Sequence, residues 1–374
     1  MRKLIHTIIP PPVRSEIKRL IFRRPRICPQ LRAWAEASPD AQIIKVYWET
    51  HERTRPLPPA GEGEMPEVFL KNTRYPVYDR TLLKIRQIRI SGRSGMLTLP
   101  DGQVSHQTAW AREQITETAE YRKRWAGPVV TKSGNYSTLI LFWGLGYYHW
   151  FNDVLSLLYE NLALMPPDTK FIVPSDIQKY HLQALEVLGV TADRLEYFDG
   201  SQDWVLENFW WQPPAVHPDN QTPGAMRWMG EAISSALPRS GDEKPLRIYV
   251  SRKLPWARVI QNERQILPVL EKHGFTLVRN EEHSFEAQVR LFRNAEAVTA
   301  PHGAGLTNLI FCRPETPVLE MFSRDNVRRC YWTLSTELGL PYRFLLGVPV
   351  PGRLGEADIS VEPSKLDAIL AAMF

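Results

Sequence analysis

The feature that most constrains the fold is a regular alternation of short apolar runs and amphipathic segments between residues 246 and 345. The apolar runs have the length of buried strands and cover residues 246–250, 276–278, 296–300, 318–322 and 342–345. Helical patterns separate them, from residue 263, over residues 284–294 and near residues 331–338. Strands joined through helices pair in parallel, so this part of the chain predicts a doubly wound α/β sheet. Ser284 is a suitable N-cap for the second helix, whereas Pro268 predicts that the first is kinked or begins late.

The first half of the chain shows a weaker form of this alternation. Strands are predicted at residues 82–90, 137–143, 171–174, 195–198 and 209–211, and helices at residues 147–158 and 177–188. This order favours a second βα-layered domain. Residues 28–127 are rich in proline and are predicted to be mostly irregular, as the outer part of that domain.

A chain of 374 residues exceeds what one hydrophobic core usually serves, so two domains are expected. The Pro-, Ser- and Gly-rich residues 238–244 mark the connection between them. The predicted organisation is a basic amphipathic arm at residues 1–30, an N-terminal α/β domain at 31–240 and a C-terminal Rossmann-like domain at 241–374. The last helix, residues 365–374, can pack back on either domain.

Charge and cysteine content bear on the compartment. The net charge is +5, yet residues 1–26 hold eight basic side chains against the single acid Glu16. Isoleucine and leucine interleave with these charges, a mix that suits an anionic membrane surface; a solvated tail is the alternative. No apolar run approaches the roughly 20 residues of a spanning helix. Three cysteines are too few for a disulfide framework. We therefore expect a cytoplasmic protein, peripheral at the inner face of the membrane if the arm binds there.

The stretch between residues 299 and 308 has the layout of an anion site. An apolar strand precedes His302, and a helix-like run follows the small residues Gly303, Ala304 and Gly305. Glycines let the backbone approach a ligand closely, and the first N–H groups of a helix favour phosphate. The alternative is a tight strand-to-helix turn with a core histidine.

Other polar residues follow neighbouring strands of the same predicted sheet. Arg252, within Ser251-Arg252-Lys253, follows the first strand, with Arg258 and Asn262-Glu263 shortly beyond it. Glu320 sits at the end of Val318-Leu319-Glu320, within the fourth strand. Guanidinium groups neutralise a diphosphate, and a carboxylate at a strand end can hold ribose hydroxyls. A surface ion pair for Arg252 and a structural hydrogen bond for Glu320 are the alternatives.

A second polar pair lies in the first half of the chain. His149 and Asp153 are one helical turn apart, directly after a glycine-flanked strand end, where α/β sheets place their ligand crevices. Ser156 and Glu160 continue this edge and are expected to form only the wet face of the helix.

Metal-binding patterns are missing from the sequence. No two aspartates are separated by a single residue, and no paired histidines or cysteines have the spacing of zinc ligands. We expect no metal and no cofactor, and nothing indicates a nucleic-acid partner.

These residues together resemble the glycosyltransferase 61 family, which includes bacterial capsular polysaccharide biosynthesis proteins. The resemblance rests on Arg252, Arg258 with Asn262-Glu263, Gln288, the run from His302 through Gly303, Ala304 and Gly305 to Asn308, and Glu320; Tyr148-His149-Trp150 with Asp153 resembles the N-terminal signature. It covers roughly residues 133–345 and is sharpest over 247–322. It implies a GT-B architecture, in which two Rossmann-like domains face a cleft, the C-terminal one holding the sugar nucleotide and the N-terminal one the acceptor. It also implies inverting, metal-independent transfer.

Inversion requires a base on the acceptor side, opposite the leaving nucleotide. We expect Asp153 to be the base with His149 orienting it, or the reverse, and His302 to donate to the diphosphate or the sugar. The predicted function is transfer of a hexosyl- or pentosyl-type sugar from a nucleotide sugar to a glycan or lipid-linked glycan in surface polysaccharide biosynthesis. The alternatives are a non-catalytic module that binds a nucleotide or glycan, and a membrane-surface scaffold.

Overall fold

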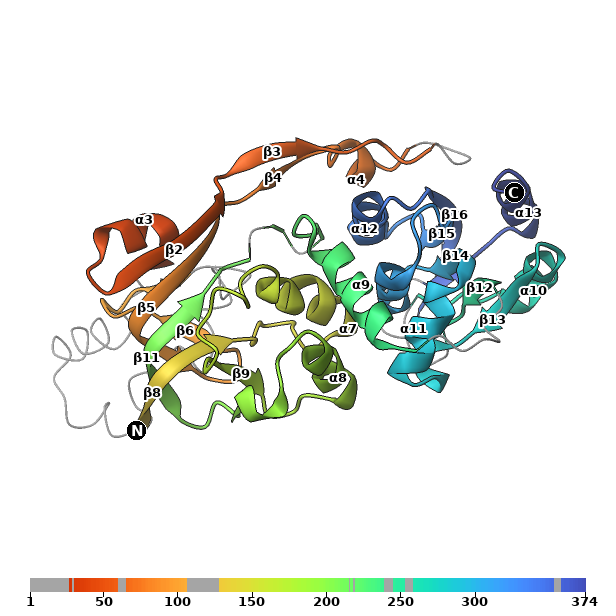
Figure 1. Ribbon diagram of the computed structural model, residues 1–374. Helices are drawn as coiled ribbons and strands as arrows, with labels where there is room; N and C mark the ends of the chain where they lie inside the picture. The colour runs from red at the N-terminus through yellow and green to blue at the C-terminus, as the bar shows by residue number, and fades with distance from the viewer. Residues whose placement is uncertain are drawn as a thin grey trace, which may run out of the picture.

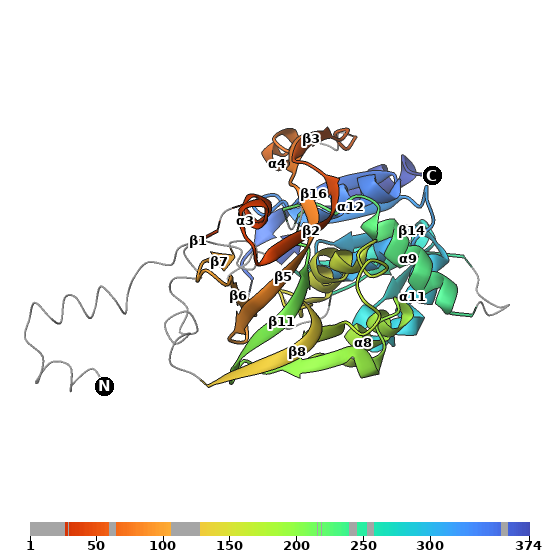
Figure 2. The ribbon, with the colours of Figure 1, turned by 60° about the vertical axis from the view of Figure 1, so that its left-hand side comes forward.

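The computed structural model describes residues 27–28, 30–59, 65–105, 128–214, 216–217, 219–238, 245–252, 258–352 and 358–374. Within these residues the chain forms two large sheets with helices packed between them (Figure 1, Figure 2). Most of the predicted basic arm, residues 1–26, falls outside the described residues, as do residues 239–244 of the predicted connection and Lys253.

The second sheet confirms the parallel alternation predicted from the sequence. Its strands are β12 (Leu246–Val250), β13 (Phe275–Val278), β14 (Ala295–Pro301), β15 (Val318–Ser323), β16 (Tyr342–Val350) and β17 (Asp358–Ser360), in the order β13-β12-β14-β15-β16-β17. All neighbours pair in parallel except β17, which is antiparallel to β16. The chain leaves β12 in one direction and returns past it to β14. The carboxyl ends of β12 and β14 therefore flank the switch point where such sheets bind ligands.

Helices cover both faces of this sheet, as a doubly wound fold requires. On one face lie α11 (Phe285–Arg293), the 3₁₀ helix η6 (Ala304–Phe311) and α12 (Cys330–Leu338); on the other lie α10 (Glu263–Lys272) and α13 (Pro363–Ala371). Ser284 caps α11 as predicted, since its Oγ accepts from the N–H of Ala287 at 3.2 Å. A late start for the first helix is wrong, because α10 begins at Glu263 and contains Pro268. The last helix, α13, packs on α10.

The first sheet is mixed rather than doubly wound. Its strands are β1 (Ile27–Cys28), β2 (Ala41–Trp48), β5 (Arg80–Ser91), β6 (Met96–Thr98), β7 (Val104–Ser105), β8 (Val129–Thr138), β9 (Lys170–Pro174), β10 (Leu195–Phe198) and β11 (Asp203–Trp211). Only β11, β8, β9 and β10 form a continuous parallel block, while β5 runs antiparallel to β11, β2 and β6. The expectation of a second doubly wound domain is therefore wrong in this half, although α8 (Lys179–Val187) follows β9 as predicted.

Two further expectations for the first half need correction. Residues 28–105 are not mostly irregular, because they supply β2, β5, β6, β7 and the helix α3 (Leu31–Ala37). The predicted strand at residues 137–143 ends at Thr138. Residues 139–141 beyond it are buried without forming a strand, and Phe142 and Trp143 are exposed in the turn that follows.

An extended arm ties the first sheet to the second. It consists of β3 (His51–Thr54), α4 (Glu67–Leu70) and β4 (Arg74–Val77), and we call it the β3–β4 arm. The arm reaches from the first sheet to α12, at the top of Figure 1. Phe69 of α4 is fully buried, with its ring 5.1 Å from those of Trp332 and Phe344. This aromatic anchor holds the arm against the second sheet.

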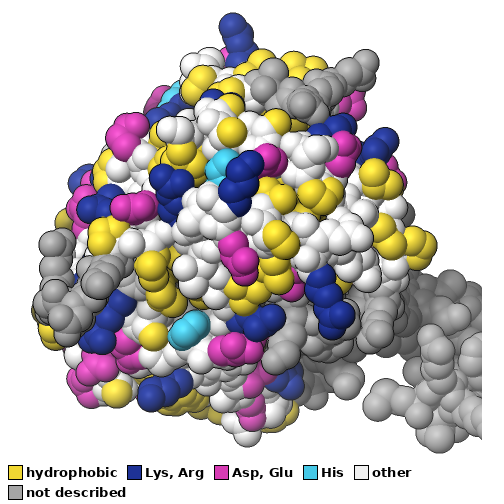
Figure 3. All heavy atoms as spheres, turned by 90° about the vertical axis from the view of Figure 1, so that its right-hand side faces the viewer, with side chains coloured by type: hydrophobic (Ala, Val, Ile, Leu, Met, Phe, Trp, Pro, Cys, Tyr) yellow, Lys and Arg dark blue, Asp and Glu magenta, His cyan; other side chains and the backbone are white. Residues whose placement is uncertain are grey.

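The two halves share one continuous apolar core, which α9 (Ala225–Ala236) bridges. A Cβ on Gly230 of α9 would lie 1.9 Å from the carbonyl oxygen of Ile310 in η6, so the two backbones are in close contact. A smaller second core lies under α10 and α13. On the face that carries these two helices, positive, negative and apolar side chains are interspersed among the described residues (Figure 3). The mixed α/β architecture with parallel strands is thus confirmed, and two domains facing a cleft stay a prediction.

Candidate functional site

A buried histidine–carboxylate pair lies at the switch point of the second sheet. Nδ1 of His302 is 2.5 Å from Oε1 of Glu320, and Tyr342 donates its hydroxyl to Oε2 of Glu320 at 2.6 Å. Glu320 has no exposed surface, and the ring of His302 stacks on Phe322. A direct contact between Glu320 and a ribose is incompatible with this burial. Glu320 instead makes structural hydrogen bonds, which was the alternative to ribose binding.

Burial determines the protonation of this pair. It raises the pKa of Glu320 well above the usual range and, with the charges of Arg258 and Arg252, lowers the pKa of His302 well below it. Both shifts favour the uncharged forms of the two side chains. With Tyr342 donating to Oε2, a carboxyl proton on Oε1 would donate to Nδ1, and in that arrangement Nε2 of His302 carries the ring hydrogen and is a donor.

Arg252 closes the turn that follows His302. Its Nη1 donates to the carbonyl oxygen of His302 at 2.8 Å. A Cβ on Gly303 would lie only 1.7 Å from that nitrogen. Glycine at position 303 therefore makes room for the guanidinium, and a positive charge lies against the turn that opens η6. The sequence prediction that Arg252 and His302 to Gly305 gather at one place is confirmed.

The rest of the turn is held by amide side chains. Asn280 donates to the carbonyl oxygen of Gly305 at 3.2 Å, and Gln288 donates to that of Asn280 at 2.9 Å. Asn308 has no exposed surface; it donates to Gln288 at 3.0 Å, and its Oδ1 accepts from the hydroxyl of Tyr147 at 2.5 Å. Asn308 therefore shapes the site by linking its two halves, and its amide is not exposed to a ligand.

The other predicted donor residues divide into two groups. Arg258 lies close enough for its charge to depress the pKa of His302. Asn262 and Glu263 face other partners: Asn262 exchanges hydrogen bonds with the backbone of Val361, and Glu263 accepts from Ser251 Oγ at 2.6 Å. These two residues hold the frame behind Arg252, since their hydrogen bonds are made within the protein.

The second predicted pair forms as expected, in an unusual helix. After α7 (Tyr147–His149) the chain makes a π-helix, η2 (Trp150–Val154), and a 3₁₀ helix, η3 (Leu155–Leu158). Nδ1 of His149 lies 2.6 Å from Oδ2 of Asp153, and Asn152 donates to Oδ1 at 2.9 Å. Short π-helical segments are rare in proteins, and those that occur are often found at functional sites.

Burial makes the two members of this pair unequal. The side chain of Asp153 is 6% exposed and that of His149 is 32% exposed. Burial raises the pKa of Asp153, which makes its carboxylate a stronger acceptor for the Nδ1 proton of His149. The wet face predicted for Ser156 is wrong, because Ser156 is buried and donates to the carbonyl of Asp153 at 3.1 Å. Glu160 is partly exposed and pairs with Arg80.

Two tyrosine rings connect the pairs. Ring centroids lie 5.3 Å apart between His149 and Tyr148, 5.5 Å between Tyr148 and Tyr331, and 5.4 Å between Tyr331 and His302. A chain of ring contacts thus links the histidine of the first half to that of the second. No sequence pattern distinguishes Tyr331 from Trp332, the adjacent aromatic residue on the buried helix α12.

Asn220 and Gln221 are further members of the site that the sequence analysis missed. The carbonyl oxygen of Asn220 accepts from Asn152 at 3.0 Å, and Gln221 Nε2 donates to the hydroxyl of Tyr148 at 3.3 Å. Both are buried in a loop before α9. The proline-rich stretch around these two residues has the composition of an ordinary surface loop. Only the fold brings them beside Asp153.

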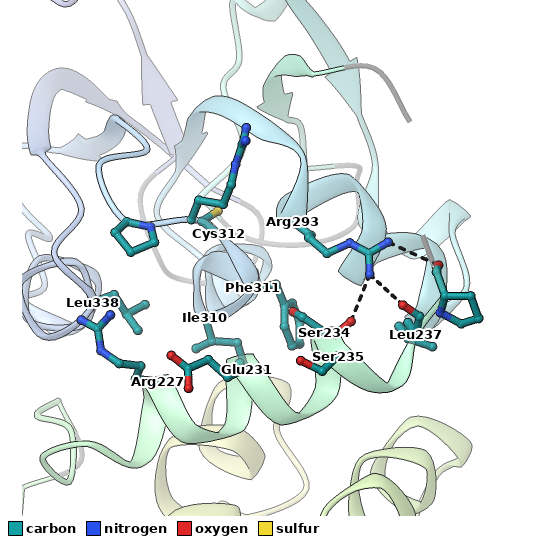
Figure 4. A pocket seen from close by; sticks show the side chains of 14 residues that line it. Arg227, Glu231, Ser234, Ser235, Leu237, Arg293, Ile310, Phe311, Cys312 and Leu338 are labelled. Atoms are coloured by element: carbon teal, nitrogen blue, oxygen red, sulfur yellow. Dashed lines mark hydrogen bonds between the residues drawn. The ribbon is translucent and has the colours of Figure 1, made fainter. Parts of the chain in front are cut away.

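A cavity of about 530 Å³ lies elsewhere, between α9 and the end of η6 (Figure 4). Arg293 at its edge donates to the carbonyl oxygens of Ser234 and Leu237 at 3.0 and 2.9 Å, which caps the end of α9. Arg293 and Pro314, which line the cavity, precede β14 and β15. The cavity is therefore at the amino edge of the second sheet, opposite His302.

The described residues contain neither a metal-binding cluster nor a membrane-spanning helix. No three His, Cys, Asp or Glu side chains among them gather in a way that could hold a metal ion. No helix in the described part of the chain has the length and apolar character needed to cross a membrane.

Comparison with known proteins finds a family match over part of the chain. Residues 147–319 match the model of the glycosyltransferase 61 family. Over 126 residues the chain is 31% identical to an EGF domain-specific O-linked N-acetylglucosamine transferase of Drosophila melanogaster, an alignment that covers 32% of this chain and 24% of the relative. The chain thus spans about a quarter of the length of that relative. The family match begins at Tyr147 and includes both histidine–carboxylate pairs except Glu320, which follows its last residue.

Proposed function

Because residues 147–319 belong to the glycosyltransferase 61 family, we propose that this protein transfers a sugar from a nucleotide-sugar donor to a glycan or lipid-linked glycan acceptor. The observation that carries the proposal is the joining of the His149–Asp153 and His302–Glu320 pairs through Tyr148 and Tyr331. One pair lies at the switch-point edge of a parallel sheet, and the other comes from the first half of the chain. A transfer reaction needs groups that bind the donor diphosphate and a base that activates the acceptor in one site.

The second sheet supplies the donor side. Arg252, Arg258 and the N-terminus of η6 offer positive charge, and Nε2 of His302 offers a hydrogen-bond donor. Together they would hold the diphosphate and stabilise the charge that develops as the bond between the anomeric carbon and the phosphate oxygen breaks. Cationic side chains would fill the role that a metal ion has in other glycosyltransferases, so we propose metal-independent transfer without a cofactor.

The first half supplies the base, and the geometry favours His149. Both oxygens of Asp153 accept hydrogen bonds inside the protein, from His149 and Asn152. His149 is the more exposed of the two and has Nδ1 held by the carboxylate. In the proposed step, Nε2 of His149 takes the proton of the acceptor hydroxyl as its oxygen attacks the anomeric carbon, and the diphosphate leaves with the bonding electrons. Asp153 stabilises the resulting imidazolium.

Attack from the face opposite the diphosphate inverts the anomeric centre. We propose a GT-B-like arrangement for this chemistry, with the donor on residues 241–374 and the acceptor on residues 31–240. The basic residues 1–26 and the unpaired cysteines are consistent with a cytoplasmic protein that is peripheral at an anionic membrane, acting in surface polysaccharide synthesis.

A transfer assay with product stereochemistry tests the proposal. The full chain is incubated with a panel of nucleotide sugars and oligosaccharide acceptors, with and without EDTA, and the new linkage is read by NMR at early times. We expect transfer that resists EDTA and gives the anomer opposite to that of the donor. A retained configuration would contradict the placement of the base, and nucleotide binding without turnover across the panel would indicate a non-catalytic module.

A further inference from the structure

A cavity of about 210 Å³ lies between the β3–β4 arm and α12, away from the donor side of the site. Arg53 and Arg55 line it from the arm, Gln221 from the loop before α9, and Thr333 and Glu337 from α12. Of these residues only Gln221, which donates to Tyr148, belongs to the site described above, and none has a role in the proposed transfer step. The proposed transfer step therefore does not explain this cavity.

Arg55 is the most unusual member of this cavity. It is only 7% exposed, and its guanidinium stacks 3.6 Å from the ring centroid of Tyr75. Nη2 donates to Oδ1 of Asn220 at 2.9 Å. Nε is buried and has no hydrogen-bond partner among the described residues. A buried guanidinium normally has its donors satisfied by a carboxylate, so an unmet N–H beside a cavity indicates an absent acceptor.

The neighbouring charges leave this region positive. Nη1 of Arg53 is likewise buried without a hydrogen bond in the described part of the chain, and its acid Glu337 is 3.7 Å away. The other oxygen of Glu337 is committed to the N–H of Gly224 at 2.9 Å. Burial, together with the charges of Arg329 and Arg53, lowers the pKa of Arg55 to about 10. Two carboxylates, Glu337 beside Arg53 and Asp219 at 3.7 Å from Arg329, thus face three arginines. Excess buried charge is costly unless an anion compensates it.

The cavity adjoins the base through two consecutive residues. Asn220 accepts from Arg55 with its side chain and from Asn152 with its carbonyl, and the same Asn152 amide donates to Asp153. Gln221 lines the cavity and donates to Tyr148, the neighbour of His149. A group bound in the cavity would therefore lie on the acceptor side of the site.

We propose that this cavity is an acceptor subsite for an anionic group, a sugar carboxylate or a phosphate, that Arg53 and Arg55 hold while a nearby hydroxyl of the same glycan faces His149. The inference rests on the proposed function and names its acceptor class, an acidic glycan. Planar guanidinium groups match the oxygens of carboxylates and phosphates, and Thr333 beside them adds a hydroxyl to the polar lining.

Binding of simple anions to the full chain tests this without turnover. Titration calorimetry would use glucuronate as the carboxylate probe, glucose 1-phosphate as the phosphate probe and glucose as the neutral control. The variant is Arg53→Gln, whose side chain is 38% exposed and whose loss should leave the fold intact. The matched control is Arg74→Gln on the adjacent strand, 74% exposed and absent from the cavity lining.

We expect one of the two anions to bind more tightly than glucose by at least tenfold, and Arg53→Gln to lose most of that difference while Arg74→Gln keeps it. Tighter binding of glucuronate would identify the anionic group as a sugar carboxylate, and tighter binding of glucose 1-phosphate would identify it as a phosphate. Arg53→Glu, which reverses the charge, should abolish anion binding. Equal affinity for glucuronate, glucose 1-phosphate and glucose, or equal affinities in the two glutamine variants, would overturn the inference. Because no donor is present, this result is independent of whether transfer is observed.

Discussion

His181 provides a pH-dependent test of how the first half is built. It lies in the first turn of α8 and has no exposed surface. Its Nδ1 accepts from the N–H of Gln178 at 2.9 Å, and Nε2 donates to the carbonyl of Leu145 at 3.3 Å, in the turn that precedes His149. Both ring nitrogens are committed in the neutral form, so a second ring proton would remove the bond to Gln178.

The magnitude follows from the pKa. Burial lowers the pKa of His181 from 6.5 to about 4. Below pH 6.5 the unfolded chain binds a proton that the native chain does not, so the free energy of unfolding falls as the pH falls towards 4. Integrating the proton uptake gives a loss of about 2 kcal/mol at pH 5 relative to pH 7.

Urea unfolding followed by tryptophan fluorescence at pH 7 and pH 5 measures this loss. His181→Phe and His181→Gln cannot take up the proton, so each should lose about 2 kcal/mol less than the wild type between the two pH values. Other histidines contribute equally to all three proteins and cancel in the comparison. If the three proteins show the same pH dependence, the burial of a neutral His181 is refuted.

Two glycine contacts give further predictions. Gly303→Ala should displace the Arg252 guanidinium and weaken nucleoside diphosphate binding by roughly tenfold or more in calorimetry, as a lost charge-assisted hydrogen bond does. Arg252→Gln should weaken binding to the same extent, because both variants remove the guanidinium from the turn. A double variant that binds more weakly than either single variant would argue against this shared cause. Gly230→Ala should lower the free energy of unfolding by about 1–3 kcal/mol, because its Cβ meets the carbonyl of Ile310, although alanine is the better helix former. Ser235→Ala, exposed on the same helix, should change little, and a Gly230→Ala protein as stable as this control would contradict the packing.

The second sheet was predictable because its strands are buried on both faces. β15 is buried at every position and appears in the sequence as an apolar run that only Glu320 interrupts before Ser323. The first sheet was less predictable, because β8 is half-exposed and polar in composition, whereas the apolar run after it forms no strand and ends in a turn. The antiparallel pairing of β5 with β11 joins residues more than a hundred positions apart, and no local pattern records it.

The candidate site shows the same division. The spacing of His149 and Asp153 predicted their contact, and the strand ends predicted that Arg252 and His302 meet. The sequence could not tell which polar residues near a strand end face a ligand and which hold the turn. Glu320 and Asn308 hold the turn, because a buried bend must satisfy its own hydrogen bonds.

The most direct test of the account is the effect of His149→Gln on the turnover number for sugar transfer, measured beside the affinity for the donor nucleotide. We predict that kcat falls by roughly 10²–10⁴-fold, as expected when a general base is removed, while the nucleotide binds as in the wild type. A His149→Gln protein that transfers sugar at the wild-type rate would contradict the central claim that this histidine, oriented by Asp153, activates the acceptor.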